Sequence, residues 1–306
     1  MPPDRTDRTA DDGPVLITIT EKEALGYDNP EARRNSELQR RVNDNREQIH
    51  SVVQPYVEAK IHRQVEMTGI QAPYPYLAVN VGWRTIDEPL VAGSEYVFPN
   101  ADGTLRSTAY IGESGTSLSS ETVNGIYLMA YRDEFDTVLA DLLETHPEFG
   151  GGLPHGYIRD RNLADPVFSV LFVTPLSATD DDELTEAILS AGDTLYEAYL
   201  DRPQRASVEW RKLVDKVTAG LPLTLNVRLV LADPGTELTE DLTRRLADDV
   251  RNHPLLAAFG SWNVFTFSNL IDRDTNDFHQ EFIADGDSGR PDWLVWEYAD
   301  GQSVHR

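Results

Sequence analysis

Leu221–Asn252, with the sequence LPLTLNVRLVLADPGTELTEDLTRRLADDVRN, decides the fold. Its first part, Leu223–Leu231, is an apolar run of strand length, and the turn residues Asp233–Thr236 follow it. The remainder predicts an amphipathic helix, because leucine or valine recurs at every fourth residue from Leu238 to Val250. The stretch therefore predicts a strand followed by a helix that packs an apolar stripe against the core.

A second stretch repeats this order. Val167–Val173 is an apolar run, and Thr179 and Asp182 have the spacing of a helix-capping box. Glu183–Glu186 then repeats Glu237–Glu240 letter for letter. These residues predict another strand followed by a helix with an acidic first turn, where the helix dipole favours anions.

A third unit is predicted around residue 130. Ile126–Ala130 is an apolar run interpreted as a strand, and Asp133 is the expected cap of the helix after it. Apolar residues with helical spacing follow at Phe135, Val138, Leu139, Leu142 and Leu143. Three such units predict an α+β fold.

We predict two α+β domains in this chain. Residues 1–13 form a polar tail that is disordered or bound to a partner, and residues 14–148 form an N-terminal domain. Residues 149–162 form a glycine-rich linker to the C-terminal domain, residues 163–306. The N-terminal domain combines a long helix with antiparallel strands and a strand–helix unit. The C-terminal order β-α-α-β-α-β-β predicts a ferredoxin-like sheet with helices on one face.

The long N-terminal helix begins with Asn29 as its cap. Apolar residues three and four apart form a short heptad seam at Leu38–Tyr56. Pro55 predicts a kink or break, and a second helical segment is expected to stop at Gly69.

Two later stretches are predicted as loops, and one as a hairpin. Gly112–Asn124 is rich in serine, threonine and glycine, and Ile271–Arg290 is dense in acids and glycines. An Asp-Gly pair, Asp102-Gly103, predicts a turn between strands at Tyr96–Phe98 and Leu105–Ile111.

The composition indicates where the protein works. The chain carries 27 basic and 52 acidic residues, a formal net charge of −25 and a pI near 4.5. Its only lysines are Lys22, Lys60, Lys212 and Lys216. Acid excess with few lysines is expected in molar salt, where the Debye length falls to roughly 3 Å and screens repulsion between carboxylates. We therefore expect a halophilic protein, from an archaeon or its virus.

Composition also restricts partners and location. Cysteine is absent, so neither disulfides nor thiol chemistry is expected. No apolar run approaches the roughly 18 residues of a membrane span, and the N-terminus lacks a signal-peptide core. We expect a soluble protein in the cytoplasm or in a virion, without a membrane partner. Nucleic acid is not expected as a partner, although an acid excess that adapts the chain to salt says little about partners.

Five residues are candidates for contacts between subunits. Arg5 and Arg8 of the tail can pair with a neighbour's carboxylates. Asn45 interrupts the apolar seam, as asparagines that set register in coiled coils do, or it lies at the rim of an intramolecular contact. Arg33 and Arg40 crowd the same helix and could hold phosphates, although interleaved acids favour a solvated, ion-paired face.

An acidic loop is the candidate metal site. Asp272, Asp274, Asn276 and Asp277 offer oxygen atoms, which hard cations such as calcium prefer. The EF-hand pattern is not met, since Asp277 stands where glycine is needed and Ile283 where glutamate is needed. The loop predicts either a chance cluster of acids or a structural cation, and no other cofactor is expected.

The first half resembles a known class of proteins. A helix, strands that begin at Pro75–Val79, and a strand running into Ala140–Leu143 are similar in order to the neck and tail-completion subunits of tailed viruses. The resemblance implies a ring-forming, non-enzymatic structural subunit that binds itself and other structural subunits. One alternative is a metal-assisted hydrolase that uses loop 272–287. The other is a host ligand-binding or regulatory protein built on the second half.

Overall fold

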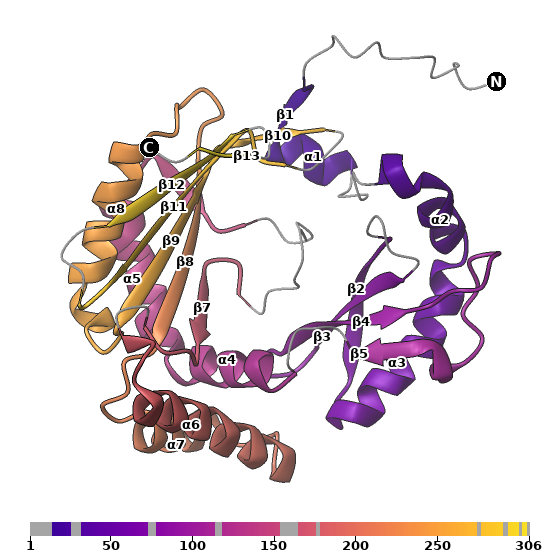
Figure 1. Cartoon of the computed structure of the whole chain (residues 1–306), viewed down its shortest axis with the longest axis horizontal. Coiled ribbons are helices and arrows are strands. Elements are labelled where there is room, and N and C mark those ends of the chain that lie inside the picture. The colour runs from indigo at the N-terminus through magenta and orange to yellow at the C-terminus, as the bar shows by residue number, and fades with distance from the viewer. Residues whose placement is uncertain are drawn as a thin grey trace.

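The computed structural model describes residues 14–25, 32–72, 78–113, 118–153, 165–175, 178–273, 277–289, 293–299 and 302–304. These residues form a mixed α+β fold, as predicted, with a large sheet and a small sheet on opposite sides of the molecule (Figure 1). Helix α4 (Leu118–Ala130) runs between the two sheets. The two-stranded pair of β1 (Leu16–Thr18) and β10 (Leu270–Asp272), with α1 (Ile19–Leu25), lies at the opposite end of the view.

The large sheet has seven strands. They are β6 (Phe149–Gly151), β7 (Phe168–Leu171), β8 (Thr224–Leu231), β9 (Ser261–Phe267), β11 (Gln280–Asp287), β12 (Leu294–Ala299) and β13 (Gln302–Val304). Their order is β13, β12, β11, β9, β8, β6, and β7 also pairs with β8. Only β8 and β9 are parallel among these described pairs. The sheet exceeds the predicted ferredoxin-like arrangement because β6, β11 and β13 join it.

The stretch that begins with β8 forms the predicted strand–helix unit. Helix α8 (Glu240–Asn252) carries the chain from β8 to the parallel strand β9. Its cap is Thr239, whose hydroxyl accepts a hydrogen bond from the backbone N–H of Leu242 at 3.2 Å. Leu242, Leu246 and Val250 are buried against the sheet, as their spacing predicts.

Helix α5 (Arg132–Thr145) confirms the helix of the third predicted unit and lies on the same face of the sheet as α8 (Figure 1). His146, at the end of α5, contacts Asp249 of α8 with 2.7 Å between Nε2 and Oδ2. His253, at the end of α8, contacts Asp141 of α5 at 3.2 Å. These two contacts tie the carboxyl-terminal parts of the helices together.

The second predicted unit, β7 followed by α6 (Asp182–Asp201), is present with a different cap. The N-cap is Asp181, whose Oδ1 accepts from the backbone N–H of Leu184 at 2.9 Å, so the box predicted from Thr179 and Asp182 is wrong. The repeated letters Glu-Leu-Thr-Glu lie inside α6 but straddle the start of α8. An aspartate just before the repeat caps α6, so the same four letters take different positions in the two helices.

The strand of the third predicted unit is wrong, because Ile126–Ala130 is the end of helix α4. The loop predicted at Gly112–Asn124 is wrong for the same reason, since α4 begins at Leu118. Val123, Ile126 and Tyr127 are buried together, which is helical spacing that a short apolar run does not reveal. Helix α4 packs against β7, α6 and α7 (Ser207–Val217).

The small sheet is a meander covered by the long helical segment. Its strands are β2 (Val65–Gln71), β3 (Val79–Thr85), β4 (Ala92–Val97) and β5 (Ile111–Glu113), paired in that order and antiparallel. Two helices precede them, α2 (Ala32–Asp44) and α3 (Arg46–Ile61). The predicted Asp-Gly turn lies in the β4–β5 connection, where Gly103 has a φ of +84° and its N–H donates to Asn100 O.

The break allowed for at Pro55 is absent, and the predicted stop at Gly69 is wrong. Helix α3 continues through Pro55, which is exposed, while Ile49, Val53 and Val57 are buried along the core side and hold the helix in place. The helix ends at His62, which adopts the left-handed conformation, and Gly69 lies in strand β2.

The loop predicted at Ile271–Arg290 contains strands β10 and β11. In β11, Phe282 and Ala284 are buried on one face, whereas Glu281 and Asp285 are half-buried on the other. This is the period of two of a strand. The acids Glu281, Asp285 and Asp287 belong to the face of the sheet away from α8, whereas Gly286 lies on the α8 face, where an added Cβ would meet Arg251.

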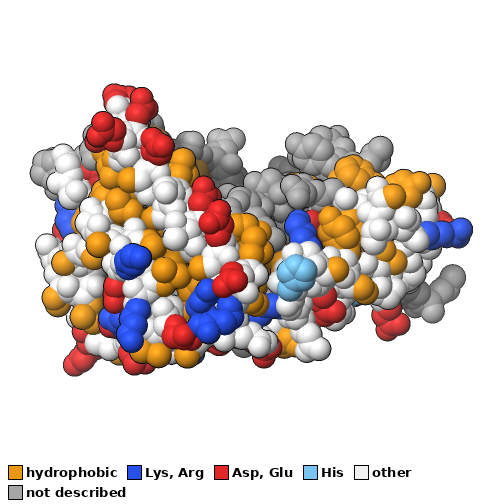
Figure 2. All heavy atoms as spheres, turned by 90° about the horizontal axis from the view of Figure 1, so that it is seen from below, with side chains coloured by type: hydrophobic (Ala, Val, Ile, Leu, Met, Phe, Trp, Pro, Cys, Tyr) orange, Lys and Arg blue, Asp and Glu red, His pale blue; other side chains and the backbone are white. Residues whose placement is uncertain are grey.

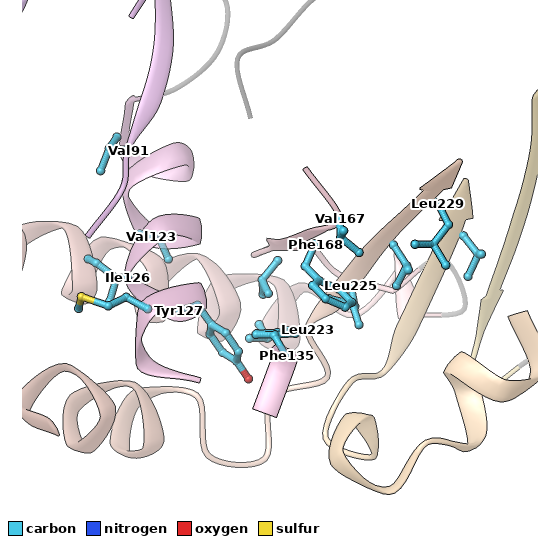
Figure 3. Close-up of a cluster of buried hydrophobic side chains, with 14 of the residues drawn as sticks. Val91, Val123, Ile126, Tyr127, Phe135, Val167, Phe168, Leu223, Leu225 and Leu229 are labelled. Carbon is cyan, nitrogen blue, oxygen red and sulfur yellow. The ribbon is translucent and has the colours of Figure 1, made fainter. Parts of the chain in front are cut away.

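One apolar core runs across the predicted domain boundary. Figure 3 shows Val91 beside β4 and Ile126 of α4 continuing into Phe135, Phe168 and Leu225 of the large sheet's core. The linker predicted from residue 149 is wrong at its start, because residues 149–151 form β6, and residues 154–162 lie outside the described residues. The division into two domains stays a prediction.

Strand β1 pairs with β10, far along the chain. The backbone N–H of Ile19 donates to Asn269 Oδ1 at 3.3 Å across 250 residues of sequence. Lys22 of α1 donates to the Arg273 carbonyl oxygen at 2.7 Å. The beginning of the described chain is thus held by its end.

Candidate functional site

The face of the large sheet away from α8 carries an ordered set of polar side chains. Ser169 of β7 pairs in register with Asn226 of β8, Asn226 pairs with Asn263 of β9, and Asn263 pairs with Asp285 of β11. Residues opposite each other on neighbouring strands point to the same face with Cβ atoms roughly 5 Å apart. These four residues, called the polar row below, cross the middle of the sheet on the side turned toward the centre of the molecule (Figure 1).

Hydrogen bonds connect the polar row. Asn226 Nδ2 donates to Ser169 Oγ at 3.2 Å, and Asn263 Nδ2 donates to Asn226 Oδ1 at 2.8 Å. At the far end, Trp296 Nε1 donates to Asp285 Oδ2 at 3.4 Å. Because each amide both donates and accepts, the bonds fix which way the two asparagines point.

A second polar line lies beside the row. Thr224 of β8 pairs in register with Ser261 of β9, and Ser261 pairs with Asp287 of β11. The two hydroxyl oxygens are 2.5 Å apart, and Asp287 Oδ1 accepts from the backbone N–H of Gly289 at 2.9 Å. All three residues are buried, as are Ser169 and Asn226 of the polar row.

Half-buried residues border the row on its other side. Arg228 donates to Ser169 Oγ at 3.0 Å, and its guanidinium lies 5.5 Å from the centre of the Phe265 ring. Ile283 and Trp296 continue this line across β11 and β12. The border is therefore apolar and aromatic, with one cation.

The row has hydrogen-bonding capacity left for a ligand. Asn263 is half-buried, and within the described part of the chain its Oδ1 has no hydrogen-bond partner. Amides and hydroxyls together offer donors and acceptors side by side. The half-buried end of the row, at Asn263 and Asp285, with the apolar border beside it, matches a small ligand that also alternates donors, acceptors and apolar patches.

The residues predicted to bind a metal are not brought together in the described part of the chain. Asp272 lies in β10 opposite Leu16, and its backbone N–H donates to the Asp277 carbonyl oxygen at 2.8 Å. Asp274 and Asn276 lie outside the described residues. Among the residues that are described, no group of three or more histidines and carboxylates is placed to hold a metal ion. The hydrolase hypothesis therefore stays a prediction.

The predicted interaction residues have contacts within the chain or lie outside the description. Arg5 and Arg8 lie outside the described residues, and Arg33 belongs to α2. Arg40 is exposed and forms ion pairs on α2, at 3.0 Å to a glutamate and 3.3 Å to an aspartate. Asn45, between α2 and α3, donates to the carbonyl oxygens of Arg41 and of the hairpin turn. Their role between subunits stays a prediction.

Sequence reasoning missed the polar row. A usable signal is the regular interruption of apolar strands by polar residues two apart, as in Thr224, Asn226 and Arg228, and in Ser261 and Asn263. Each strand by itself shows only an ordinary alternation. The row exists because the register aligns four strands that lie far apart in the sequence.

Over the ranges that the structure describes, none of the helices combines the length and the apolar character needed to cross a bilayer.

Comparison with known proteins identifies the fold only. No family model matches the sequence, and no curated protein matches it. The structure is similar to a DUF1672 family protein from Staphylococcus aureus, with a TM-score of 0.58 and 10% sequence identity over 90% of this chain and 98% of that one. A DUF5037 family protein from Ruminococcus gnavus covers 83% of this chain and 93% of its own length at 10% identity, with a TM-score of 0.25. The first likeness shows a shared fold.

Proposed function

We propose that this chain is a non-catalytic binding protein that holds a small polyhydroxylated ligand, such as a sugar, against the polar row. The observation that carries the proposal is the register of Ser169, Asn226, Asn263 and Asp285 across four strands. Two of these residues, Ser169 and Asn226, are buried, and the other two, Asn263 and Asp285, are half-buried. A hydrogen-bonded row that ends in half-buried polar groups supports binding, because those groups can still pair with a ligand.

The chemistry of the row favours polyols over other small ligands. Sugar hydroxyls donate and accept, as do the amides and hydroxyls of the row, so each can match the other in either direction. The apolar face of a sugar ring can pack on Phe265 and Trp296 at the border. Arg228 and Asp285 add charge-assisted hydrogen bonds, which are roughly twice as strong as neutral ones.

A sugar panel tests the proposal. The unfolding temperature is measured in molar salt with glucose, N-acetylglucosamine, maltose and cellobiose, and at least one sugar should raise it. Asn263→Leu should remove that rise. Asn80→Leu is the matched control, because Asn80 is also a half-buried strand amide but lies in the small sheet.

Two outcomes would contradict this function. If no sugar raises the unfolding temperature, or if Asn263→Leu and Asn80→Leu respond alike, the row is a structural network only. If a disaccharide is bound and split, the protein is an enzyme. Asp285 and Asp287 would then be the carboxylates to examine, since they lie two residues apart on the same face of β11.

An assembly role is the second proposal, and exposed apolar side chains support it. Leu189, Leu200 and Val208 on the α6–α7 pair are 55%, 45% and 59% exposed. Phe98 and Tyr110, about half exposed, lie next to each other in the β4–β5 connection, where the backbone N–H of Phe98 donates to the Tyr110 carbonyl oxygen. Figure 2 shows orange apolar patches among charged side chains on the face seen from below in Figure 1. Such patches suit contacts with further subunits.

We propose in this second reading a ring-forming subunit of a halophilic particle, such as a virion neck or tail. Native mass in molar salt should exceed that of a monomer, and Leu200→Glu should reduce it. Lowering the salt should lower the unfolding temperature, because the −25 net charge is then unscreened. A monomer at high concentration, or equal stability at both salt levels, would contradict these expectations.

A further inference from the structure

A small pocket lies between the two halves of the chain, away from the polar row. Its volume is about 140 Å³. Four segments meet there: the β3–β4 connection, α4, the first part of α5 and the residues that lead into β7. A dry cavity of roughly 150 Å³ holds a molecule of the size of benzene. The pocket therefore fits a ligand with one small ring or a short aliphatic body.

The floor of the pocket is apolar and close-packed. Met129, Phe135, Val167 and Phe168 line it and are buried. The ring centres of Phe135 and Phe168, both labelled in Figure 3, are 4.9 Å apart. Gly125 permits the close approach of α4, because a Cβ at this position would lie 2.0 Å from the Leu90 carbonyl oxygen. The floor is thus shaped by backbone contacts that leave little room for change.

The connection that carries the pocket's acidic residue is held rigidly. Buried Arg63 donates to the carbonyl oxygens of Asp87, Glu88 and Pro89. The hydroxyl of Thr85 donates to Pro89 O at 3.2 Å and accepts from Val91 N at 2.9 Å. Glu88 is therefore presented to the pocket by a fixed backbone.

The mouth of the pocket has an excess of negative charge. Glu88, Asp136 and Asp165 line it with a single cation, Arg132. Arg132 donates to Glu88 Oε1, whereas Glu88 Oε2 is shielded from solvent and has no hydrogen-bond partner among the described residues. Asp165 Oδ1 accepts from the two backbone N–H groups of Val167 and Phe168, at 2.8 and 2.7 Å. A buried acceptor without a donor is costly, so a ligand N–H at Glu88 Oε2 would be favoured.

We infer that this pocket binds a small organic ammonium ion, with its apolar body on the Met129–Phe135 floor and its N–H groups on Glu88 Oε2. The ligand group that pairs with Glu88 Oε2 must be a donor, because this carboxylate oxygen is an acceptor. Three carboxylates against one guanidinium require a positive ligand charge. The inference does not rest on the sugar-binding proposal and involves none of the same residues.

Benzylamine and benzyl alcohol are the probes that test this inference. They have the same ring and length, but only the amine is charged at neutral pH. Calorimetric titration of the full chain in molar salt should give saturable binding of benzylamine at millimolar concentration and much weaker binding of benzyl alcohol. Partly buried charges are screened less by salt than exposed ones, so the difference should persist.

Two variants should move benzylamine affinity in opposite directions. Glu88→Gln keeps the shape of the side chain but removes its charge, and should weaken binding about tenfold or more, as expected for a charge-assisted hydrogen bond. Arg132→Gln removes the competing cation, and should tighten binding about twofold, as expected for a half-exposed charge. Glu209→Gln is the control, because Glu209 also pairs with an exposed arginine, Arg202, at 2.6 Å.

A purely structural Glu88–Arg132 ion pair would give another pattern. Loss of either partner would then change benzylamine affinity in the same direction, or not at all. That pattern overturns the inference, as does equal binding of the two probes or no binding of benzylamine to the unmodified chain. Because Arg132 is exposed, Arg132→Gln keeps the test valid even if Glu88→Gln folds poorly.

Discussion

The two faces of the large sheet differ in what their side chains do. Toward α8 and α5, Leu225, Val227 and Leu229 of β8 alternate into one apolar core. The hydroxyls of Thr243 and Thr266, 2.8 Å apart, lie buried between α8 and β9 on this face. On the other face, the same strands carry the polar row and a half-buried border.

The difference separates folding from function. The α8 face follows from burial, because apolar area removed from water contributes roughly 25 cal/mol per Å² and needs no particular partner. The polar face requires donors and acceptors in register and gains little net stability from them. Residues whose positions are precise but whose contribution to stability is small are the best candidates for binding.

The largest effect is expected on the apolar face. Leu246→Ala in α8 removes a fully buried side chain and leaves a cavity, so the free energy of unfolding should fall by about 2–5 kcal/mol. Urea unfolding in molar salt measures it. A fall in the free energy of unfolding of less than about 1 kcal/mol would mean that the buried apolar side chains of α8 contribute little to stability.

The next effect depends on pH and tests whether water reaches the buried side chain of Tyr127 in the apolar core. Burial, with help from the charge of Asp215, raises the pKa of Tyr127 from 10.0 to about 12. Between these pH values the folded chain keeps a proton that the unfolded chain releases, so the free energy of unfolding falls as pH rises. The loss should approach about 2–3 kcal/mol by pH 12 and be absent below pH 10.

Tyr127→Phe should remove the part of this loss that is due to Tyr127. Urea midpoints recorded at pH 9, 10, 11 and 12 give the comparison. If the free energy of unfolding of Tyr127→Phe fell with pH as steeply as that of the unmodified chain, Tyr127 would ionise without cost in the folded state. Water would then reach its hydroxyl group.

A smaller effect is expected on the polar face. Asn263→Leu deprives Asn226 Oδ1 of its donor, and a buried acceptor without a partner costs about 1 kcal/mol or more. The cost should stay well below that of Leu246→Ala. A larger loss than that of Leu246→Ala would place the polar row in the folding core and remove the contrast between the two faces.

The smallest effect is expected when both partners are replaced. In the double variant Asn226→Leu/Asn263→Leu, neither position keeps a side-chain acceptor that has lost its donor. Ser169 still accepts a hydrogen bond from Arg228. The double variant should therefore be closer to the original stability than Asn263→Leu alone. Additive losses in urea unfolding would contradict this account of the row.

Local patterns predicted much of the fold. The α8 stripe, the helical spacing in α5 and the apolar run of β8 each carry their own signal, and all three are confirmed. The signals that failed were ambiguous in themselves. The five apolar residues at the end of α4, Ile126–Ala130, fit a strand as well as a helix. In β11, the acidic residues suggested a loop, although apolar residues alternate with them as in a strand.

The candidate site could not be predicted from the sequence, for a different reason. Asn226 and Asn263 are 37 residues apart and meet only because β8 and β9 are parallel and in register. The pocket likewise needs Glu88, Arg132 and Asp165 from three separate segments. Strand pairing across a sheet and packing between distant segments cannot be predicted from local sequence patterns.

The pairing of β1 with β10 determines how early in the synthesis of the chain these two strands can meet. Ile19 and Asn269, which meet there, are separated by 250 residues, and a ribosome adds roughly 5–20 residues per second. About 12–50 s therefore pass between the synthesis of β1 and the synthesis of its partner strand β10. Throughout that interval the backbone groups of β1 can pair only with water or with another chain. The closure of β1 on β10 therefore cannot precede the synthesis of Asp272, although β1 is made near the start of the chain.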